Sequence, residues 1–292
     1  PDVQNQGYAA GAAAAMAARD KTGIRGIDVR ALQRHLVEIG NLPESVLTDT
    51  DSHPLPPQRV AAAVEGLVDD YRNLAIVLGH RQASLPLLQY AYQRAKGEKK
   101  LAYAKVLGMM GDDTGLETLV AEVERAETWD KPPAWNIGGD YPEATRVGWG
   151  MSHLDNMLVA LGRTGRAEAL PAVLAKLAML EAKTSFSHHR AVYLALEWLG
   201  DPQAAKPLAE LLHSPGMSGH AVTSIDQRAS SAPTRSQATR ELILARTLYR
   251  CGDWQGAAEK TLETYSRDLR GHFARHARAV LAAGRDHKPS HE

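Results

Sequence analysis

The sequence of 292 residues carries 34 basic and 34 acidic side chains, so its formal net charge is zero and neither nucleic acid nor an anionic membrane is indicated as the main partner. Its single cysteine, Cys251, excludes an internal disulfide framework and a cysteine-based zinc site. The longest apolar run, near Ala9–Ala18, is too short and too rich in alanine to span a bilayer.

Two helices are predicted at the N-terminus. Gly7–Gly11 opens an alanine-rich helix that runs through Ala12–Arg19. Small side chains along nearly every face would let this helix approach another backbone or a flat ligand, and its free N–H groups would favour an acceptor or an anion. An alanine-rich helix is also stable without a ligand, so both interpretations stay open. The second helix covers 28–38, with Asp28 as its N-cap, and ends at Gly40.

Residues 41–56 are rich in proline and polar side chains, which predicts a linker to a larger domain at 57–292. In that domain the apolar periodicity predicts helices at about 57–73, 84–96, 99–110 and 114–126.

A helical phrase recurs along the larger domain. Each time an apolar helix end runs into a glycine, and a second amphipathic stretch follows; the equivalent glycines are Gly111, Gly165, Gly200 and Gly252. Glycine tolerates the left-handed backbone that ends a helix in a tight turn. Such helix–turn–helix units cannot bury their apolar faces alone, so they must stack. With two Phe residues and no alternating Val, Ile and Thr to build a sheet, the sequence predicts an all-α fold, a HEAT-like α-solenoid of antiparallel helix pairs.

Two stretches interrupt the repeat. Residues 127–149 form a long insertion that holds three of the five tryptophans, Trp129, Trp135 and Trp149. Aromatic side chains in such a loop could bind a substrate by stacking on a sugar ring, or could simply pin the loop to the solenoid. The second stretch, 214–236, is rich in Ser, Gly, Pro and Thr and is predicted to be mobile or ordered by a partner.

Histidines near helix starts supply the candidate chemistry. The expected helix starts place Ser152 as a cap before His153 and Ser187 as a cap before His188 and His189. If successive repeats superpose, these histidines share one rim, where they could act as general base or substrate clamp.

Two further residues, Arg190 and His220, are candidate substrate-binding residues on the same rim, near Asp155. The alternative is that these polar residues only satisfy backbone donors at helix starts and face solvent. No His-x-x-x-His or glutamate-partnered zinc motif occurs, so no metal site is predicted.

Two parts of the sequence resemble a known family. The run D-V-Q-N-Q-G-Y-A-A-G-A-A-A-A-M-A-A, followed by G-I-D-V-R-A-L-Q-R-H-L-V-E-I-G, resembles the end of the flavin domain in bacterial FAD-dependent oxidoreductases. Residues 56–285, with F-S-H-H-R-A-V and G-M-S-G-H-A, resemble the helical-repeat extension that some members carry.

The resemblance implies that residues 1–40 close an FAD site. Backbone N–H groups of Gly7, Tyr8 and Ala9 would then face the pyrimidine edge of the flavin, and Gln4 and Asn5 would bond the ring or the ribityl chain. The Gly-x-Gly-x-x-Gly fold that grips the ADP half of FAD in this family is missing from the sequence. FAD would therefore be held mainly by an N-terminal flavin-binding domain of the same polypeptide, outside this chain.

Two functions follow as alternatives. As the C-terminal part of an FAD-dependent oxidoreductase, the chain would close the flavin site and shape a pocket for a small, carbohydrate-like substrate, and alone it would be inactive. A start at Pro1 rather than Met favours this interpretation. Alternatively, the chain is a free-standing HEAT-like α-solenoid that binds a protein or peptide. The bacterial compartment, cytoplasm or periplasm, stays open.

Overall fold

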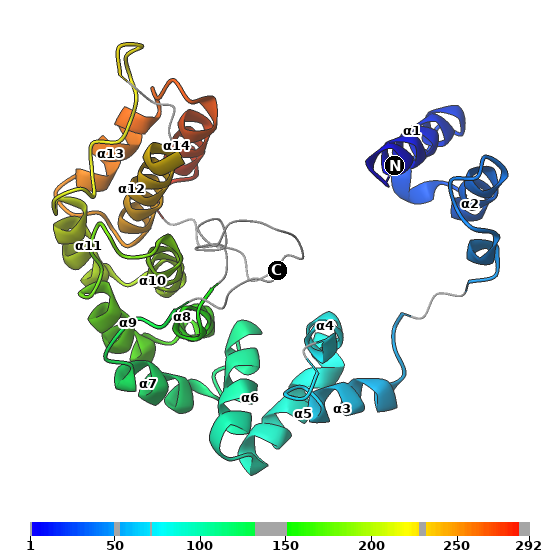
Figure 1. The fold of residues 1–292 in the computed structure, drawn as a ribbon, viewed down its shortest axis with the longest axis horizontal. Helices are drawn as coiled ribbons and strands as arrows, with labels where there is room; N and C mark the ends of the chain where they lie inside the picture. The colour runs from blue at the N-terminus through cyan, green and yellow to red at the C-terminus, as the bar shows by residue number, and fades with distance from the viewer. Residues whose placement is uncertain (1, 50–52, 71, 132–150, 228–231, 286–292) are drawn as a thin grey trace. The chain divides into compact units, whose positions relative to one another are not determined.

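The computed structural model describes residues 2–49, 53–70, 72–131, 151–227 and 232–285, and every regular element within these ranges is a helix (Figure 1). The all-α fold expected from the sequence is therefore confirmed for the described residues. The chain divides into two compact units, Pro1–Leu55 (unit 1) and Pro56–Glu292 (unit 2). Within the described ranges no helix is both long and apolar enough to cross a membrane.

Unit 1 is built from two α-helices and two 3-10 turns. The first helix, α1 (Asp2–Arg19), begins at Asp2 rather than at Gly7. The second, α2 (Val29–Glu38), has the predicted N-cap, because the Asp28 side chain accepts a hydrogen bond from the backbone of Ala31 at 3.0 Å. The 3-10 turns cover Ile24–Gly26 and Glu44–Leu47.

The first part of unit 2 holds α3 (Pro57–Glu65), α4 (Arg72–Gly79), α5 (Arg81–Arg94), α6 (Gly97–Met109) and α7 (Leu116–Arg125). The single helix expected at 57–73 is therefore wrong. Its first part ends at Gly66, a poor helix former. The carbonyl oxygen of Gly66 accepts a hydrogen bond from Nδ2 of Asn73 at 2.9 Å, so a side chain of α4 closes the turn.

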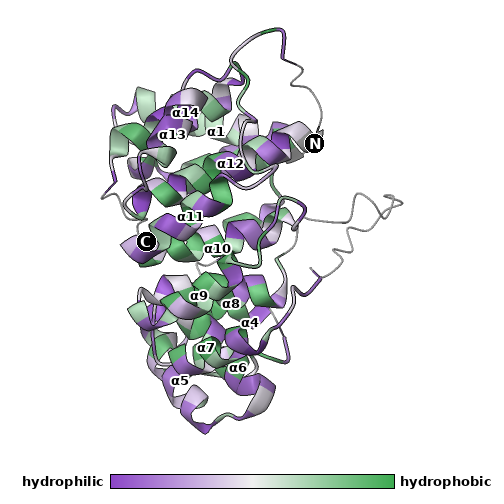
Figure 2. Ribbon diagram, turned by 90° about the vertical axis from the view of Figure 1, so that its left-hand side faces the viewer, coloured by the Kyte–Doolittle hydropathy of each residue, from purple (hydrophilic) through white to green (hydrophobic). Residues whose placement is uncertain are grey.

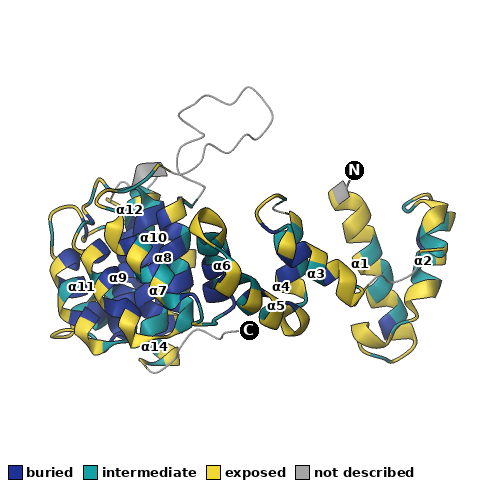
Figure 3. Ribbon diagram, turned by 90° about the horizontal axis from the view of Figure 1, so that it is seen from below, coloured by how far each residue is buried: buried dark blue, intermediate teal, exposed yellow. Residues whose placement is uncertain are grey.

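The second part of unit 2 holds α8 (His153–Thr164), α9 (Leu170–Leu177), α10 (Phe186–Leu199), α11 (Ala205–Leu212), α12 (Ala232–Arg250), α13 (Ala257–Tyr265) and α14 (Gly271–Ala283). Each of α6, α8, α10 and α12 packs against the next even-numbered helix, so these helices and α14 form one row (Figure 1). A second row, α7, α9 and α11, packs against the first. The helices are amphipathic, and buried residues gather where the rows meet (Figures 2 and 3).

The recurring glycines end four helices as the sequence predicts. Gly111, Gly165, Gly200 and Gly252 have φ angles of 75°, 66°, 61° and 106°, in the left-handed region that glycine adopts without strain. The residue four positions before each of them is a leucine that is 0% exposed: Leu107, Leu161, Leu196 and Leu248. The same local sequence therefore sets the turn and anchors the helix end in the core.

Two glycines inside helices let the first row pack closely. A Cβ atom at Gly162 of α8 would lie 2.4 Å from Cα of Ala195 on α10. A Cβ atom at Gly108 of α6 would lie 2.9 Å from the carbonyl oxygen of Ala160 on α8. Since larger side chains would collide with backbone at both places, glycine sets the spacing between neighbouring helices.

Candidate functional site

The residues predicted to face a flavin all lie on α1. Gln4, Asn5, Gly7 and Tyr8 are exposed and Ala9 is half-buried. Because α1 begins at Asp2, the N–H groups of Gly7, Tyr8 and Ala9 fall inside the helix, where each points toward the carbonyl group four residues earlier. The prediction that these N–H groups are free at a helix start is therefore wrong; the free donors lie at the residues before Gly7.

An open groove of about 640 Å³ runs along α1 and α2. Its lining combines small side chains with an aromatic ring and two basic groups: Tyr8, Gly11, Ala12, Ala15, Met16, Arg19, Ala31 and His35. The hydroxyl of Tyr8 lies 3.0 Å from Nε2 of His35, and the two rings stack with centroids 5.9 Å apart. The groove is therefore lined largely by apolar side chains, with Tyr8, Arg19 and His35 as its polar members.

The start of α8 is held by a capping box. Oγ of Ser152 accepts a hydrogen bond from the backbone of Asp155 at 3.1 Å, and the Asp155 carboxylate accepts one from the backbone of Ser152 at 3.0 Å. Ser152 is thus the cap that the sequence predicts. Both residues are 0% exposed, so the carboxylate of Asp155 is fixed in position inside the protein.

His188, at the start of α10, binds that carboxylate. Its Nδ1 lies 2.7 Å from Oδ1 of Asp155. A carboxylate oxygen accepts hydrogen bonds, so Nδ1 of His188 is the donor in this pair. The indole of Trp129 stacks on the His188 ring with centroids 4.4 Å apart and an interplanar angle of 15°. The structure therefore brings together three residues from separate segments, Trp129, Asp155 and His188.

His153 lies at the neighbouring helix start and is exposed. Its backbone N–H donates to Oδ2 of Asp130 at 2.9 Å, and Asp130 directly follows the tryptophan that stacks on His188. The ring of His153 lines a small cavity of about 210 Å³ whose polar lining includes Glu122, Arg125 and Asp130. His153 and His188 thus lie at the starts of two helices that pack together, α8 and α10.

His189 has a different environment. It is 0% exposed, its Nδ1 lies 2.8 Å from the hydroxyl of Tyr193, and its Nε2 lies 3.0 Å from the carbonyl oxygen of Glu181. Burial lowers its pKa to about 4, so the ring is neutral at pH 7. Because both nitrogens already have partners, its surroundings favour a structural role over proton transfer.

The helix that carries these histidines starts earlier than the sequence suggests. Ser185, not Ser187, is the N-cap residue of α10, and its side chain makes no capping bond. Ser187 lies inside the first turn and is buried, with its Oγ 3.3 Å from that of Ser185. Both histidines therefore lie inside the first turns of the helix, and both are buried rather than on an exposed rim.

The remaining candidates are not brought to this cluster. Arg190 is exposed and contacts Sδ of Met151 at 3.6 Å. His220 belongs to a different network, in which its Nε2 lies 3.1 Å from the carbonyl oxygen of Gly216. Trp135 and Trp149 lie outside the described residues, so their place in a substrate wall stays a prediction. Among the residues described, no group of three or more His, Cys, Asp or Glu side chains could hold a metal ion.

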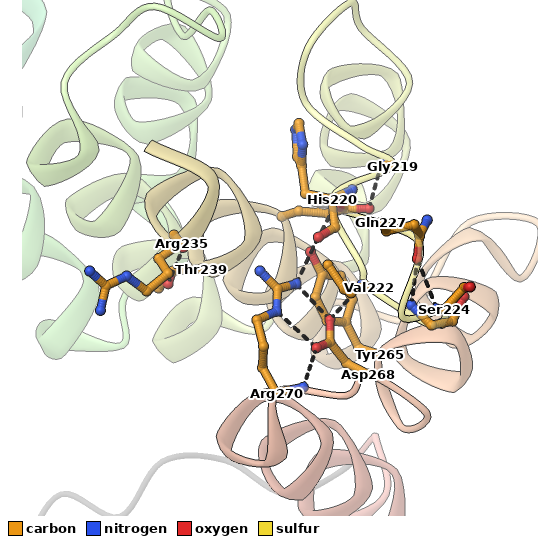
Figure 4. A network of polar contacts seen from close by, with 12 residues as sticks. Gly219, His220, Val222, Ser224, Gln227, Arg235, Thr239, Tyr265, Asp268 and Arg270 are labelled. Atoms are coloured by element: carbon orange, nitrogen blue, oxygen red, sulfur yellow. Dashed lines mark hydrogen bonds and ion pairs between the residues drawn. The ribbon is translucent and has the colours of Figure 1, made fainter. Parts of the chain in front are cut away.

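Sequence reasoning missed the carboxylates that fix the loop before α12. The carboxylate of Glu241 accepts hydrogen bonds from the backbones of Gly219 and His220 at 2.9 and 2.8 Å, and from the hydroxyl of Tyr265 at 2.8 Å. Asp268 accepts from the backbone of Val222 at 2.9 Å (Figure 4). In the described part of 214–236, the backbones of Gly219, His220 and Val222 are thus held by two buried carboxylates, which the sequence did not predict.

Geometry and electrostatics leave two candidate sites: the groove of unit 1, and the buried aspartate–histidine pair of unit 2 with its stacked tryptophan. Comparisons of this chain with protein-family models, curated proteins and solved structures found no match.

Proposed function

We propose that this chain is the C-terminal part of an FAD-dependent oxidoreductase, in which residues 1–40 complete the flavin domain and unit 2 is a HEAT-like α-solenoid that shapes the substrate pocket. The observation that carries the proposal is that unit 1 lacks a core of its own. Of its described residues only Ala17 and Leu36 are buried apolar side chains.

Two buried side chains cannot hold such a unit together. Ordering the backbone costs about 1–2 kcal/mol per residue. Burial of a large apolar side chain stabilises by only about 1.5–3 kcal/mol. Meanwhile Val3, Ile24, Val29 and Ile39 are each exposed by 47% or more. Unit 1 therefore needs a further surface against which to pack, as the end of a larger domain would.

The glycines of α1 support a close approach by a flat group. Glycine inside a helix costs about 1 kcal/mol relative to alanine. At Gly7 and Gly11 an added Cβ would meet no atom within 4 Å, so nothing described in this chain requires glycine there. Glycine at these two positions would leave room for a ligand or for another backbone. Gly11 also lines the groove along α1 and α2.

These residues fit the flavin end of FAD and not its ADP end, since no Gly-x-Gly-x-x-Gly motif is present to hold the pyrophosphate. When bound, FAD would supply a hydride acceptor for oxidation of an alcohol or amine. Such a substrate loses a proton as well. In this proposal His188, whose ring Asp155 positions, is the residue of unit 2 that accepts the proton. Trp129 and the more exposed His153 would contact a carbohydrate-like substrate.

The test is flavin content. The polypeptide translated from the complete reading frame should purify with about one FAD per chain, seen as visible flavin absorbance. Gly11→Leu should remove most of it by filling the groove. Gly23→Leu is the matched control, because a Cβ there also meets no atom within 4 Å but the residue lies outside the groove. A polypeptide without flavin that binds none on titration with FAD would contradict the proposal, as would equal flavin content in the two variants.

A second candidate, a free-standing scaffold for protein interaction, is favoured by the continuous rows of packed helices in unit 2. Stacked repeats offer an extended surface and need no cofactor. The same flavin measurement separates the two, because a scaffold would bind no FAD in any version of the polypeptide.

A further inference from the structure

The C-terminal ends of three neighbouring helices carry equivalent residues. Arg163 of α8, Trp198 of α10 and Arg250 of α12 each lie two positions before the glycine that ends the phrase. The guanidinium of Arg163 lies over the ring of Trp198, 5.2 Å from its centroid, so the side chains meet across the helices. We name Arg163, Trp198, Arg246 and Arg250 the arginine row.

Two of the three guanidinium groups of the arginine row share a single carboxylate. Glu197, 2% exposed, is this carboxylate: its Oε2 lies 2.8 Å from Nη2 of Arg246, and its Oε1 pairs with Arg250. Arg163 has no ion pair with any described residue. Both oxygens of Glu197 are thus occupied by Arg246 and Arg250, and Arg163 is left without a carboxylate partner among the described residues.

Two of these arginines are also largely buried, which makes their positive charge unfavourable. The side chains of Arg246 and Arg250 are 16% and 14% exposed, and burial lowers the pKa of each. The neighbouring His276 has its pKa lowered by burial and then by the charges of Arg246 and Arg250, so it adds no charge at pH 7. Partly buried, uncompensated positive charge is unfavourable unless a counter-charge arrives.

Buried N–H donors without acceptors lie along the same row. Nε of Arg163, Nε1 of Trp198 and Nε of Arg250 have no hydrogen-bond partner among the described residues. The Nη atoms of Arg163 are not buried in this way and have no partner within the described chain, so they are open to a ligand. Guanidinium groups bind carboxylates with paired N–H donors.

We infer that the arginine row is a docking surface for an acidic peptide segment of a partner protein. The length of the arginine row matches a short peptide better than a small anion. Neighbouring helix axes lie about 8–10 Å apart, so α8 to α12 spans about 16–20 Å, more than a single small anion covers. An extended chain advances about 3.3 Å per residue, so five or six residues match that span. The chain has balanced charge overall, without the excess of basic residues that is typical of nucleic-acid-binding proteins.

The inference concerns unit 2 alone and does not depend on the flavin proposal. It is tested on the chain itself by fluorescence anisotropy at low ionic strength, with a labelled eight-residue peptide in which Glu alternates with Ser. The control peptide carries Gln in place of Glu. We expect the Glu peptide to bind and the Gln peptide to bind at least about tenfold more weakly, because each charged hydrogen bond contributes substantially.

Substitutions locate the peptide. Arg163→Gln should weaken binding about tenfold, and Trp198→Phe, which keeps the ring and removes the indole N–H, should weaken it about threefold. Arg166→Gln is the matched control: it removes the same charge three residues away, from a side chain 49% exposed that pairs with Asp113 and Glu168. It should bind as the wild type does. Circular dichroism checks that each variant keeps its helices.

The surface is not an acidic-peptide site if Arg163→Gln and Arg166→Gln weaken binding equally, since the attraction would then be non-specific. Tighter binding of inorganic phosphate or of a single-stranded oligonucleotide that displaces the peptide would also overturn the inference. If Arg163→Gln loses helicity, Arg163→Lys and Trp198→Phe decide: wild-type binding by both refutes the arginine row.

Discussion

Replacing Gly162 with alanine tests the closest helix contact of unit 2. A Cβ atom at this position would lie 2.4 Å from Cα and 2.9 Å from the carbonyl oxygen of Ala195. Carbon atoms in contact normally lie about 3.5–4.0 Å apart. The obstructing atoms belong to the backbone and cannot rotate away, so α8 and α10 would have to separate by more than about 1 Å.

Two opposing effects determine how far Gly162→Ala lowers the free energy of unfolding. Overpacking an interior costs about 1–3 kcal/mol. Separation of the helices also loosens the packing of Leu158, Leu161 and Leu196, all 0% exposed. Alanine inside a helix is favoured over glycine by about 1 kcal/mol, which offsets part of the loss. We therefore expect Gly162→Ala to lower the free energy of unfolding by about 2 kcal/mol.

The same substitution at two other glycines gives a comparison for the loss of stability in Gly162→Ala. At Gly108 an added Cβ would lie 2.9 Å from the carbonyl oxygen and 3.0 Å from Cβ of Ala160, so alanine should cost less there, below about 1 kcal/mol. At Gly11 no atom lies within 4 Å, so alanine should leave the unfolding of unit 2 unchanged. Urea unfolding followed by circular dichroism gives the midpoints, compared at constant slope. A wild-type midpoint for Gly162→Ala, or a larger loss for Gly108→Ala, would refute this contact.

Two further changes probe buried polar groups. The pKa of His189, lowered to about 4, means that the unfolded chain takes up a proton at a higher pH than the native protein does. Stability should therefore fall by about 3 kcal/mol as the pH drops from 6.5 to 4, and His189→Gln should flatten that fall in urea unfolding; parallel pH profiles would contradict it. Glu241→Gln leaves one acceptor oxygen for the three donors that Glu241 binds, at a cost of about 1–3 kcal/mol. Limited proteolysis tests this loss: the loop at 213–227 should be cleaved faster in Glu241→Gln than in the wild type. An unchanged rate would mean that Glu241 does not hold the loop in place.

Local signals predicted the parts of the fold that depend on neighbours in sequence. The four phrase-ending glycines are left-handed because a helix that stops in a tight turn needs that backbone geometry wherever it occurs. Ser152 and Asp28 cap helices because a side-chain oxygen reaches N–H groups only a few residues away. Such contacts do not depend on how the chain folds elsewhere.

Features that depend on distant segments could not be predicted in the same way. Ser187 is as good a cap as Ser185 by residue type, and packing of the next residues against α8 decides between them. No residue near His188 in the sequence indicates that its hydrogen-bond partner is Asp155, which lies 33 residues away. Glu241 likewise reaches a loop more than 20 residues earlier. The stacking of the helices brings these distant polar groups together. The burial of His188 and His189 likewise depends on that stacking.

The interface between α8 and α10 carries two side-chain pairs of unit 2. The Asp155–His188 pair joins these helices near their starts, and the Arg163–Trp198 pair joins them at their ends. Asp155 and Arg163 lie eight positions apart on one helix, about 12 Å along its axis. The contact of Gly162 with Ala195 fixes the spacing at the same interface. Because both pairs join the same two helices, a substitution at Gly162 that separates α8 from α10 is expected to disturb both of them.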